Sequence, residues 1–172
     1  EDEFVLKAHK QLDGLLIIVP RHTERASEIE RLASSMGFVC QIRSETPNLR
    51  KETEVYVADT MGEMGIWYSL VQIAFIGGSL VERGGHNPWE AAQLGVISLH
   101  GPHIYNTSAK YKKLQSEGVS YEVNNADDIV ERFNSLSFKE LKAKAQKAKH
   151  ISKVDMIAVV EGVKVIKKAV AI

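Results

Sequence analysis

Several features that would place this chain in a specialised class are missing from its sequence. Its 172 residues include one cysteine, Cys40, so no disulfide framework can form within the chain, which fits a reducing compartment. No run of about 18 apolar residues occurs, and we expect nothing in the sequence to span a membrane. The 22 basic residues are balanced by 22 acidic ones, and this zero formal charge argues against a general nucleic-acid binder.

The start of the chain also lacks expected signals. Residues 1–4, Glu-Asp-Glu-Phe, contain neither an initiator methionine nor the basic segment of a signal peptide. This start is expected for the interior of a longer protein, from which a targeting or anchor segment is missing. The length suffices for one domain with a hydrophobic core, or for half of a larger protein.

Short apolar runs alternate with helical patterns along the chain. The run 15–19 is rich in leucine and isoleucine and is ended by Pro20, which is typical of a strand buried on both faces of a parallel sheet. Similar runs predict further strands over 38–42, 54–58, 71–76, 96–99 and 119–123. Intervening patterns predict helices over 4–12, 26–36, 64–70, 88–94, 108–117 and 124–133, followed by two more over 138–150 and 151–172. This alternation predicts an α/β fold with a doubly wound, Rossmann-like parallel sheet.

The most distinctive stretch is 76–90, which reads IGGSLVERGGHNPWE and follows the fourth predicted strand. Gly77 and Gly78 would let backbone N–H groups approach a phosphate or carboxylate, and the Ser79 hydroxyl could donate as well. A plain tight turn explains the glycines equally well. The stretch is neither a dinucleotide fingerprint nor a Walker A loop, because G-x-G-x-x-G is absent and no Gly-Lys-Ser/Thr follows.

The end of this stretch has the pattern of a helix start. Asn87, Pro88 and Glu90 suit the N-cap, N1 and N3 positions, and this role needs no ligand. Glu90 could also accept two hydrogen bonds from a ribose diol, worth on the order of 1.5–3 kcal/mol. One carboxylate can do both, so both interpretations stay open.

Polar segments follow other predicted strands. Arg21-His22 comes after the first strand, and Arg21 suits a carboxylate or phosphate, although a solvated arginine is the commoner outcome. The segment 59–63 could fold over a base or simply begin a helix. Because the carboxyl ends of parallel strands meet at one edge, we expect these loops and the loop from Gly101 to form one candidate site.

Three histidines, His86, His100 and His103, invite comparison with a metal site. Gly101-Pro102 separates two of them and excludes a helical pair, and no carboxylate or cysteine has ligand spacing. We therefore predict no metal site. No Ser/His/Asp or Cys/His nucleophile is evident from the order of residues.

Five motifs in one order closely resemble the C-terminal half of the 3-deoxy-D-manno-octulosonic acid (Kdo) transferases of lipopolysaccharide synthesis, over about 15–133. They are Pro20-Arg21-His22, Asp59-Thr60-Met61-Gly62-Glu63, Gly77-Gly78-Ser79, Gly84-Gly85-His86-Asn87-Pro88-Trp89-Glu90 and Gly101-Pro102-His103-Ile104-Tyr105-Asn106. The resemblance implies the C-terminal half of a GT-B glycosyltransferase, whose two Rossmann-like domains face each other across a cleft. It implies a CMP-Kdo-binding domain over 1–150 and a helix over 151–172 that packs back toward the absent N-terminal domain. A basic membrane-surface helix and ordinary core packing are the alternatives for 151–172.

The resemblance also implies a set of substrate-binding residues, with no catalytic residue and no metal ligand on this chain. They are Arg21, His22, Met61, Gly62, Glu63, Gly77, Gly78, Ser79, His86, Asn87, Glu90 and Asn106. The turn 77–79 and Arg21 would face the phosphate and carboxylate region of the donor. Asn87 and Glu90 would hold the phosphate side and the ribose, and 61–63 would lie near the nucleotide. The contact made by Asn106 stays open.

For the full enzyme, the resemblance implies metal-free, inverting transfer of Kdo from CMP-Kdo to a lipid A precursor. Its general base and its acceptor contacts lie on the absent N-terminal domain, so we expect this soluble fragment alone to bind the donor without turnover. The full-length protein is expected to associate with the cytoplasmic face of the bacterial inner membrane, without a nucleic-acid partner. The alternatives are another GT-B transferase or epimerase that uses a UDP-sugar, or a non-catalytic nucleotide-binding module.

Overall fold

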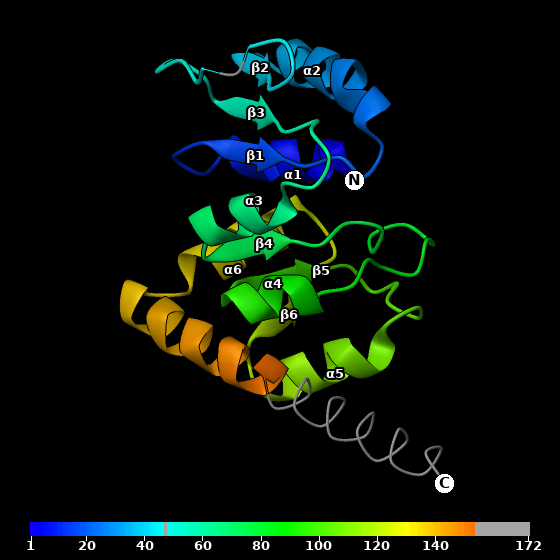
Figure 1. Ribbon diagram of the computed structural model, residues 1–172, viewed down its shortest axis with the longest axis vertical. Helices are drawn as coiled ribbons and strands as arrows, with labels where there is room; N and C mark the ends of the chain where they lie inside the picture. Colours follow the sequence, from blue (N-terminus) through cyan, green and yellow to red (C-terminus); the bar gives the residue numbers. More distant parts are fainter. Residues whose placement is uncertain (47, 154–172) are drawn as a thin grey trace, which may run out of the picture. The chain divides into compact units, whose positions relative to one another are not determined.

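The computed structural model describes residues 1–46 and 48–153, which divide into two compact units (Figure 1). Unit 1 is built from Glu1–Leu70 and Val123–Ser135, and unit 2 from Val71–Glu122 and the chain from Leu136 onward. Each unit is therefore assembled from two separate pieces of sequence. The helix predicted over 151–172 falls outside the described residues beyond position 153.

Unit 1 contains a three-stranded parallel sheet in the order β1-β3-β2. Its strands are β1 (Leu16–Ile18), β2 (Cys40–Ile42) and β3 (Val55–Val57). Its helices are α1 (Asp2–His9), the short 3-10 helix η1 (Thr23–Arg25), α2 (Ala26–Ser35), α3 (Met64–Leu70) and α6 (Ala126–Asn134).

The central strand β3 shows why the sheet of unit 1 is buried on both faces. Successive side chains point to opposite faces of a strand. Val55 and Val57 accordingly belong to apolar clusters with residues of α2, whereas Tyr56 packs against Trp67 of α3. The central strand is therefore covered on both faces, whereas β1, for which the sequence predicted such burial, is only half-buried.

Unit 2 contains a second three-stranded parallel sheet, in the order β4-β5-β6. Its strands are β4 (Ile73–Phe75), β5 (Ile97–His100) and β6 (Ser120–Glu122), and its helices are α4 (Trp89–Leu94), α5 (Ser108–Ser116) and a helix that covers 138–153 of the described residues. The central strand β5 is buried along its whole length. Figure 1 shows the helix 138–153 in orange beside α5, and Ala148 and Ile151 of this helix share an apolar cluster with Leu114 of α5.

The predicted α/β class with parallel strands is confirmed. Within the described residues, the strands form two three-stranded parallel sheets, one in each unit, and each sheet contains two strand pairs. The Asn125 side chain caps α6, because it accepts a hydrogen bond from the backbone N–H of Asp128 at 2.9 Å. None of the helices in the described part of the chain is both long enough and apolar enough to cross a bilayer.

Candidate functional site

The glycine-rich loop of unit 2, residues 77–87 after β4, folds back on itself. The backbone N–H of Gly85 donates to the carbonyl of Gly78 at 2.6 Å, and that of His86 donates to the carbonyl of Gly77 at 3.1 Å. Gly78 and Gly85 both have a φ of 72°, which residues with side chains rarely adopt. The loop therefore needs glycine for its backbone conformation, whatever it binds.

A second loop, residues 101–106 after β5, is bonded to the glycine-rich loop. Asn106 makes two of these bonds: its backbone N–H donates to Gly84 at 3.1 Å, and its side-chain amide donates to the carbonyl of Arg83 at 2.9 Å. The side chain of Asn106 thus helps to hold the loop 77–87 in place.

Ser79 is the main link between the two loops and is completely buried. Its hydroxyl donates to the carbonyl of Ile76 at 2.6 Å and accepts from the backbone N–H of Gly101 at 2.9 Å. Its own carbonyl accepts from the N–H of His103 at 2.9 Å. The structure gives the Ser79 hydroxyl an internal role, in contrast to the ligand-facing role considered for it from sequence.

The start of α4 follows directly and presents polar groups to solvent. The side-chain oxygen of Asn87 accepts from the backbone N–H of Trp89 at 3.1 Å and from the Lys110 ammonium at 3.3 Å. The helix begins at Trp89, so Pro88 holds the N-cap position that the sequence predicted for Asn87. Glu90 lies in the first helical turn and is exposed. An amide, an ammonium and a carboxylate therefore meet at this helix start.

In unit 1, Glu63 forms a two-point ion pair with Arg43. The Arg43 Nε lies 2.6 Å from one Glu63 oxygen, and an Nη atom lies 2.8 Å from the other. The Thr60 hydroxyl bonds to the same carboxylate, and the Arg43 guanidinium lies over the Trp67 ring at 5.1 Å from its centroid. The hydrogen bonds from Arg43, and next that from Thr60, lower the pKa of Glu63.

Arg43 is a residue that sequence reasoning missed. It comes directly after β2, so it stands at the same sheet edge as the segment 59–63 that follows β3. That position after a predicted strand was the signal that could have found it. Its partner Glu63 is accordingly held by a cation of the protein, and the pair fixes the shape of the segment 59–63.

The Arg43–Glu63 pair should make unit 1 sensitive to acid. Because the folded pKa of Glu63 is lowered, the pair stabilises the fold above the ordinary glutamate pKa of about 4.3, and this contribution is lost as the pH falls through the folded pKa. We expect Glu63→Gln to lower the melting temperature at pH 7 and to have a smaller effect at pH 3. Thermal unfolding measured across this pH range tests it.

The matched control for this experiment is Glu45→Gln. Glu45 is exposed and makes no ion pair within the described residues. Its substitution should leave the melting temperature nearly unchanged at both pH values. A Glu63→Gln deficit that stayed constant down to pH 3 would contradict the assignment.

The remaining predicted residues of unit 1 are exposed. Arg21 and His22 follow β1, and the His22 ring lies 3.6 Å from the Glu24 carboxylate. Met61 is 80% exposed in the segment after β3. Since β1 and β3 are neighbours, these residues share one edge of the sheet of unit 1.

Each unit thus carries its own part of the predicted set at the carboxyl ends of two neighbouring parallel strands. In unit 1 these are β1 and β3, and in unit 2 they are β4 and β5. Within residues 1–46 and 48–153, no three His, Cys, Asp or Glu side chains are placed to share a metal ion.

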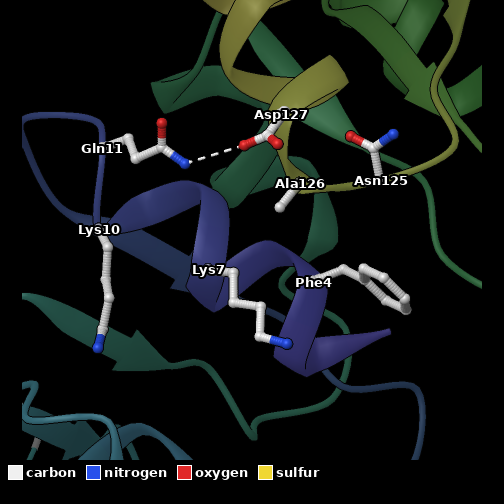
Figure 2. Close-up of a pocket in the computed structure, with 7 residues that line it drawn as sticks. All are labelled: Phe4, Lys7, Lys10, Gln11, Asn125, Ala126 and Asp127. Atoms are coloured by element: carbon white, nitrogen blue, oxygen red, sulfur yellow. Dashed lines mark hydrogen bonds between the residues drawn. The ribbon is translucent and has the colours of Figure 1, made fainter.

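A separate open depression of about 480 Å³ lies on unit 1 between α1 and the start of α6 (Figure 2). Its lining residues are Phe4, Lys7, Lys10, Gln11, Asn125, Ala126 and Asp127. Figure 2 shows the Gln11 amide donating to the Asp127 carboxylate across it, at 3.2 Å. None of the predicted substrate-binding residues lines this depression.

The parallel sheets and the polar loops at their strand ends define a Rossmann-like domain of the kind found in GT-B glycosyltransferases. A solved structure described as the C-terminal CMP-Kdo binding domain of WaaA from Acinetobacter baumannii is similar, with a TM-score of 0.76 and 30% sequence identity. The alignment covers 86% of this chain and 82% of that one. The chain belongs to the 3-deoxy-D-manno-octulosonic acid transferase family, which confirms the resemblance seen in its motifs.

Curated relatives agree with this assignment. The 3-deoxy-D-manno-octulosonic acid transferase of Haemophilus influenzae is 37% identical over 139 residues, which is 77% of this chain and 32% of the relative. That of Aquifex aeolicus is 33% identical over 141 residues, covering 79% of this chain and 38% of the relative. The chain therefore spans about a third of the length of these relatives. No family model matches the sequence.

Proposed function

We propose that this chain is the donor-binding part of a Kdo transferase and that it binds CMP-Kdo. The observation that carries the proposal is the similarity over 82% of a domain described as binding CMP-Kdo, combined with polar loops at the strand ends in both units. The full protein would transfer Kdo from CMP-Kdo to a lipid A precursor in lipopolysaccharide synthesis, as an inverting GT-B glycosyltransferase.

Within this proposal, the start of α4 binds the nucleotide. The exposed Glu90 carboxylate would accept hydrogen bonds from the ribose hydroxyls, and the adjacent N-terminal turn with Lys110 would favour the phosphate. Lys110 was not among the residues predicted from sequence. The loop 77–87 of the same unit would present its backbone to the phosphate.

We propose that the catalytic base and the acceptor site of the full protein lie outside this chain. The general base and the acceptor site are assigned to the part of the relatives that the chain does not span, so the chain alone should bind the donor without turnover. We propose that the reaction uses neither metal nor cofactor, and that the full-length protein works at the cytoplasmic face of the bacterial inner membrane.

Calorimetry on this chain with CMP, UDP and NAD tests the nucleotide assignment. We expect CMP to bind most tightly, because the domain is proposed to hold a CMP-linked sugar. Tighter binding of UDP or NAD than of CMP would overturn the proposal.

The ribose contact has its own prediction. Glu90→Ala should weaken CMP binding about tenfold or more, because a charged acceptor on two hydroxyls is lost. Gln93→Ala is the matched control, since Gln93 is exposed on the same short helix, and CMP affinity should not change. Unchanged CMP affinity in Glu90→Ala, with circular dichroism equal to that of the parent chain, would limit Glu90 to a structural role.

A further inference from the structure

His100 is a buried histidine at the end of β5 whose two ring nitrogens both have partners. Its side chain is completely inaccessible to solvent. The Nδ1 atom lies 2.7 Å from the carbonyl oxygen of Gly101, and the Nε2 atom lies 3.1 Å from the side-chain nitrogen of Gln115. The residue therefore lies between the loop 101–106 and α5.

These two partners select one form of the ring. A carbonyl oxygen can only accept, so the Nδ1 atom of His100 must carry the proton that binds Gly101. In the neutral ring the Nε2 atom is then an acceptor, and the side-chain amide of Gln115 donates a hydrogen bond to it. Burial lowers the pKa of His100, against the opposing effects of the bond to Gly101 and then of Glu122, its register partner on β6.

Gly101 is consequently held through the peptide groups on both of its sides. Its carbonyl accepts from His100, and its N–H donates to the Ser79 hydroxyl at 2.9 Å. This residue begins the loop that delivers Asn106 to the glycine-rich loop. A change in the orientation of these peptide groups would move both loops together.

Tyr111 of α5 extends the same arrangement. Its ring lies against the His100 ring with centroids 4.4 Å apart, and its hydroxyl donates to the carbonyl of His86 at 2.8 Å. Helix α5 thus supports the loop 101–106 through His100 and the loop 77–87 through Tyr111.

We propose that His100 is a positioning residue of the donor site, whose Nδ1–H sets the orientation of the peptide group between Gly101 and Pro102 and thereby the two loops that meet the donor. This role rests on the proposed function, because the loops must bind the donor for His100 to affect its affinity. His100 itself does not touch the ligand, since it is fully buried.

Two substitutions of His100 test whether its hydrogen bond to Gly101 matters or whether the side chain only fills space in the core. His100→Asn places an amide nitrogen close to the position of Nδ1 and can still donate to Gly101. His100→Gln places its amide nitrogen close to Nε2 and cannot. Both variants carry a neutral amide. They differ chiefly in whether the amide nitrogen takes the position of Nδ1 or that of Nε2.

The experiment measures amide hydrogen exchange of residues 101–106 and CMP affinity by calorimetry in the full chain and in both variants. We expect His100→Asn to stay within about threefold of the parent chain in both measurements. His100→Gln should speed exchange in this loop and weaken CMP binding, each by about tenfold or more, with the thermal unfolding transition retained. In the parent chain, ¹⁵N chemical shifts should show the Nδ1–H tautomer of His100.

Equal behaviour of the two variants, or an Nε2–H tautomer, would overturn the positioning role. The exchange measurement needs no ligand, so it distinguishes this failure from that of the proposed function. If the parent chain bound no CMP while the two variants still differed in exchange, the donor assignment would fall and the structural effect of His100 on the loop would stand.

Discussion

The substitution Gly101→Ala is expected to destabilise unit 2 by about 3 kcal/mol, because the added methyl group has no space. An ideal Cβ at this position would overlap the backbone carbonyl of Ser79 and the backbone nitrogen of Leu80. Both are main-chain atoms of the turn after β4, so relief requires the loops to separate. Separation would break the bond between Gly101 and the Ser79 hydroxyl and leave buried polar groups without partners.

Chemical denaturation of the variant measures this loss, and CMP calorimetry should show donor binding weakened with it. Gly65→Ala is the matched control, since a Cβ at Gly65 of α3 meets no atom within 4 Å. Alanine favours a helix over glycine by up to about 1 kcal/mol, so this variant should be unchanged or slightly more stable. Gly101→Ala with parental stability would show that the two loops do not approach each other so closely.

Removal of the helix 138–153 is expected to unfold unit 2. Ala148 and Ile151 of this helix cover Ala92, Leu114 and Val119, and its Lys144 donates to the carbonyl of Gly118 at 2.7 Å. A buried aliphatic side chain is worth about 1.5–3 kcal/mol, so exposing several at once costs on the order of 5 kcal/mol. A chain that ends after Ser135 should therefore lose the cooperative transition of unit 2.

The two tryptophans allow this to be measured, since Trp67 belongs to unit 1 and Trp89 to unit 2. In a Trp67→Phe background, Trp89 fluorescence should show no unfolding transition in the chain that ends after Ser135. A chain that ends after Lys153 is the control, because it keeps every residue of the described helix, and it should retain the transition. Equal transitions in both chains would mean that the helix contributes little to the core of unit 2.

The secondary structure could be predicted because its signals are local. The apolar runs around Val55–Val57 and Ile97–His100 are short and continuous, and the structure buries both strands. The pattern over 124–133 likewise matches α6, which spans Ala126–Asn134 and is capped by Asn125.

The parts of the candidate site that escaped prediction depend on contacts between distant residues. The inward orientation of the Ser79 hydroxyl is set by Gly101, 22 positions away, and the pairing of Glu63 is set by Arg43, 20 positions away. Neither partner leaves a local pattern around Ser79 or Glu63. The residue types around the site could therefore be predicted from sequence. The tertiary structure was needed to show which of these side chains hold the loops together and which face solvent.

The interleaving of the two units has a consequence for synthesis on the ribosome. Helix α6 completes unit 1 by packing against α1, yet it is translated after all three strands of unit 2. At about 5–20 residues per second, roughly 6–23 s pass between the synthesis of His9 at the end of α1 and that of Ala126 at the start of α6. Chain order therefore completes unit 1 only at Ser135, shortly before the helix 138–153 that covers the core of unit 2 is made. We expect the nascent chain to keep the surface of α1 that α6 covers open to chaperones until most of the protein has been made.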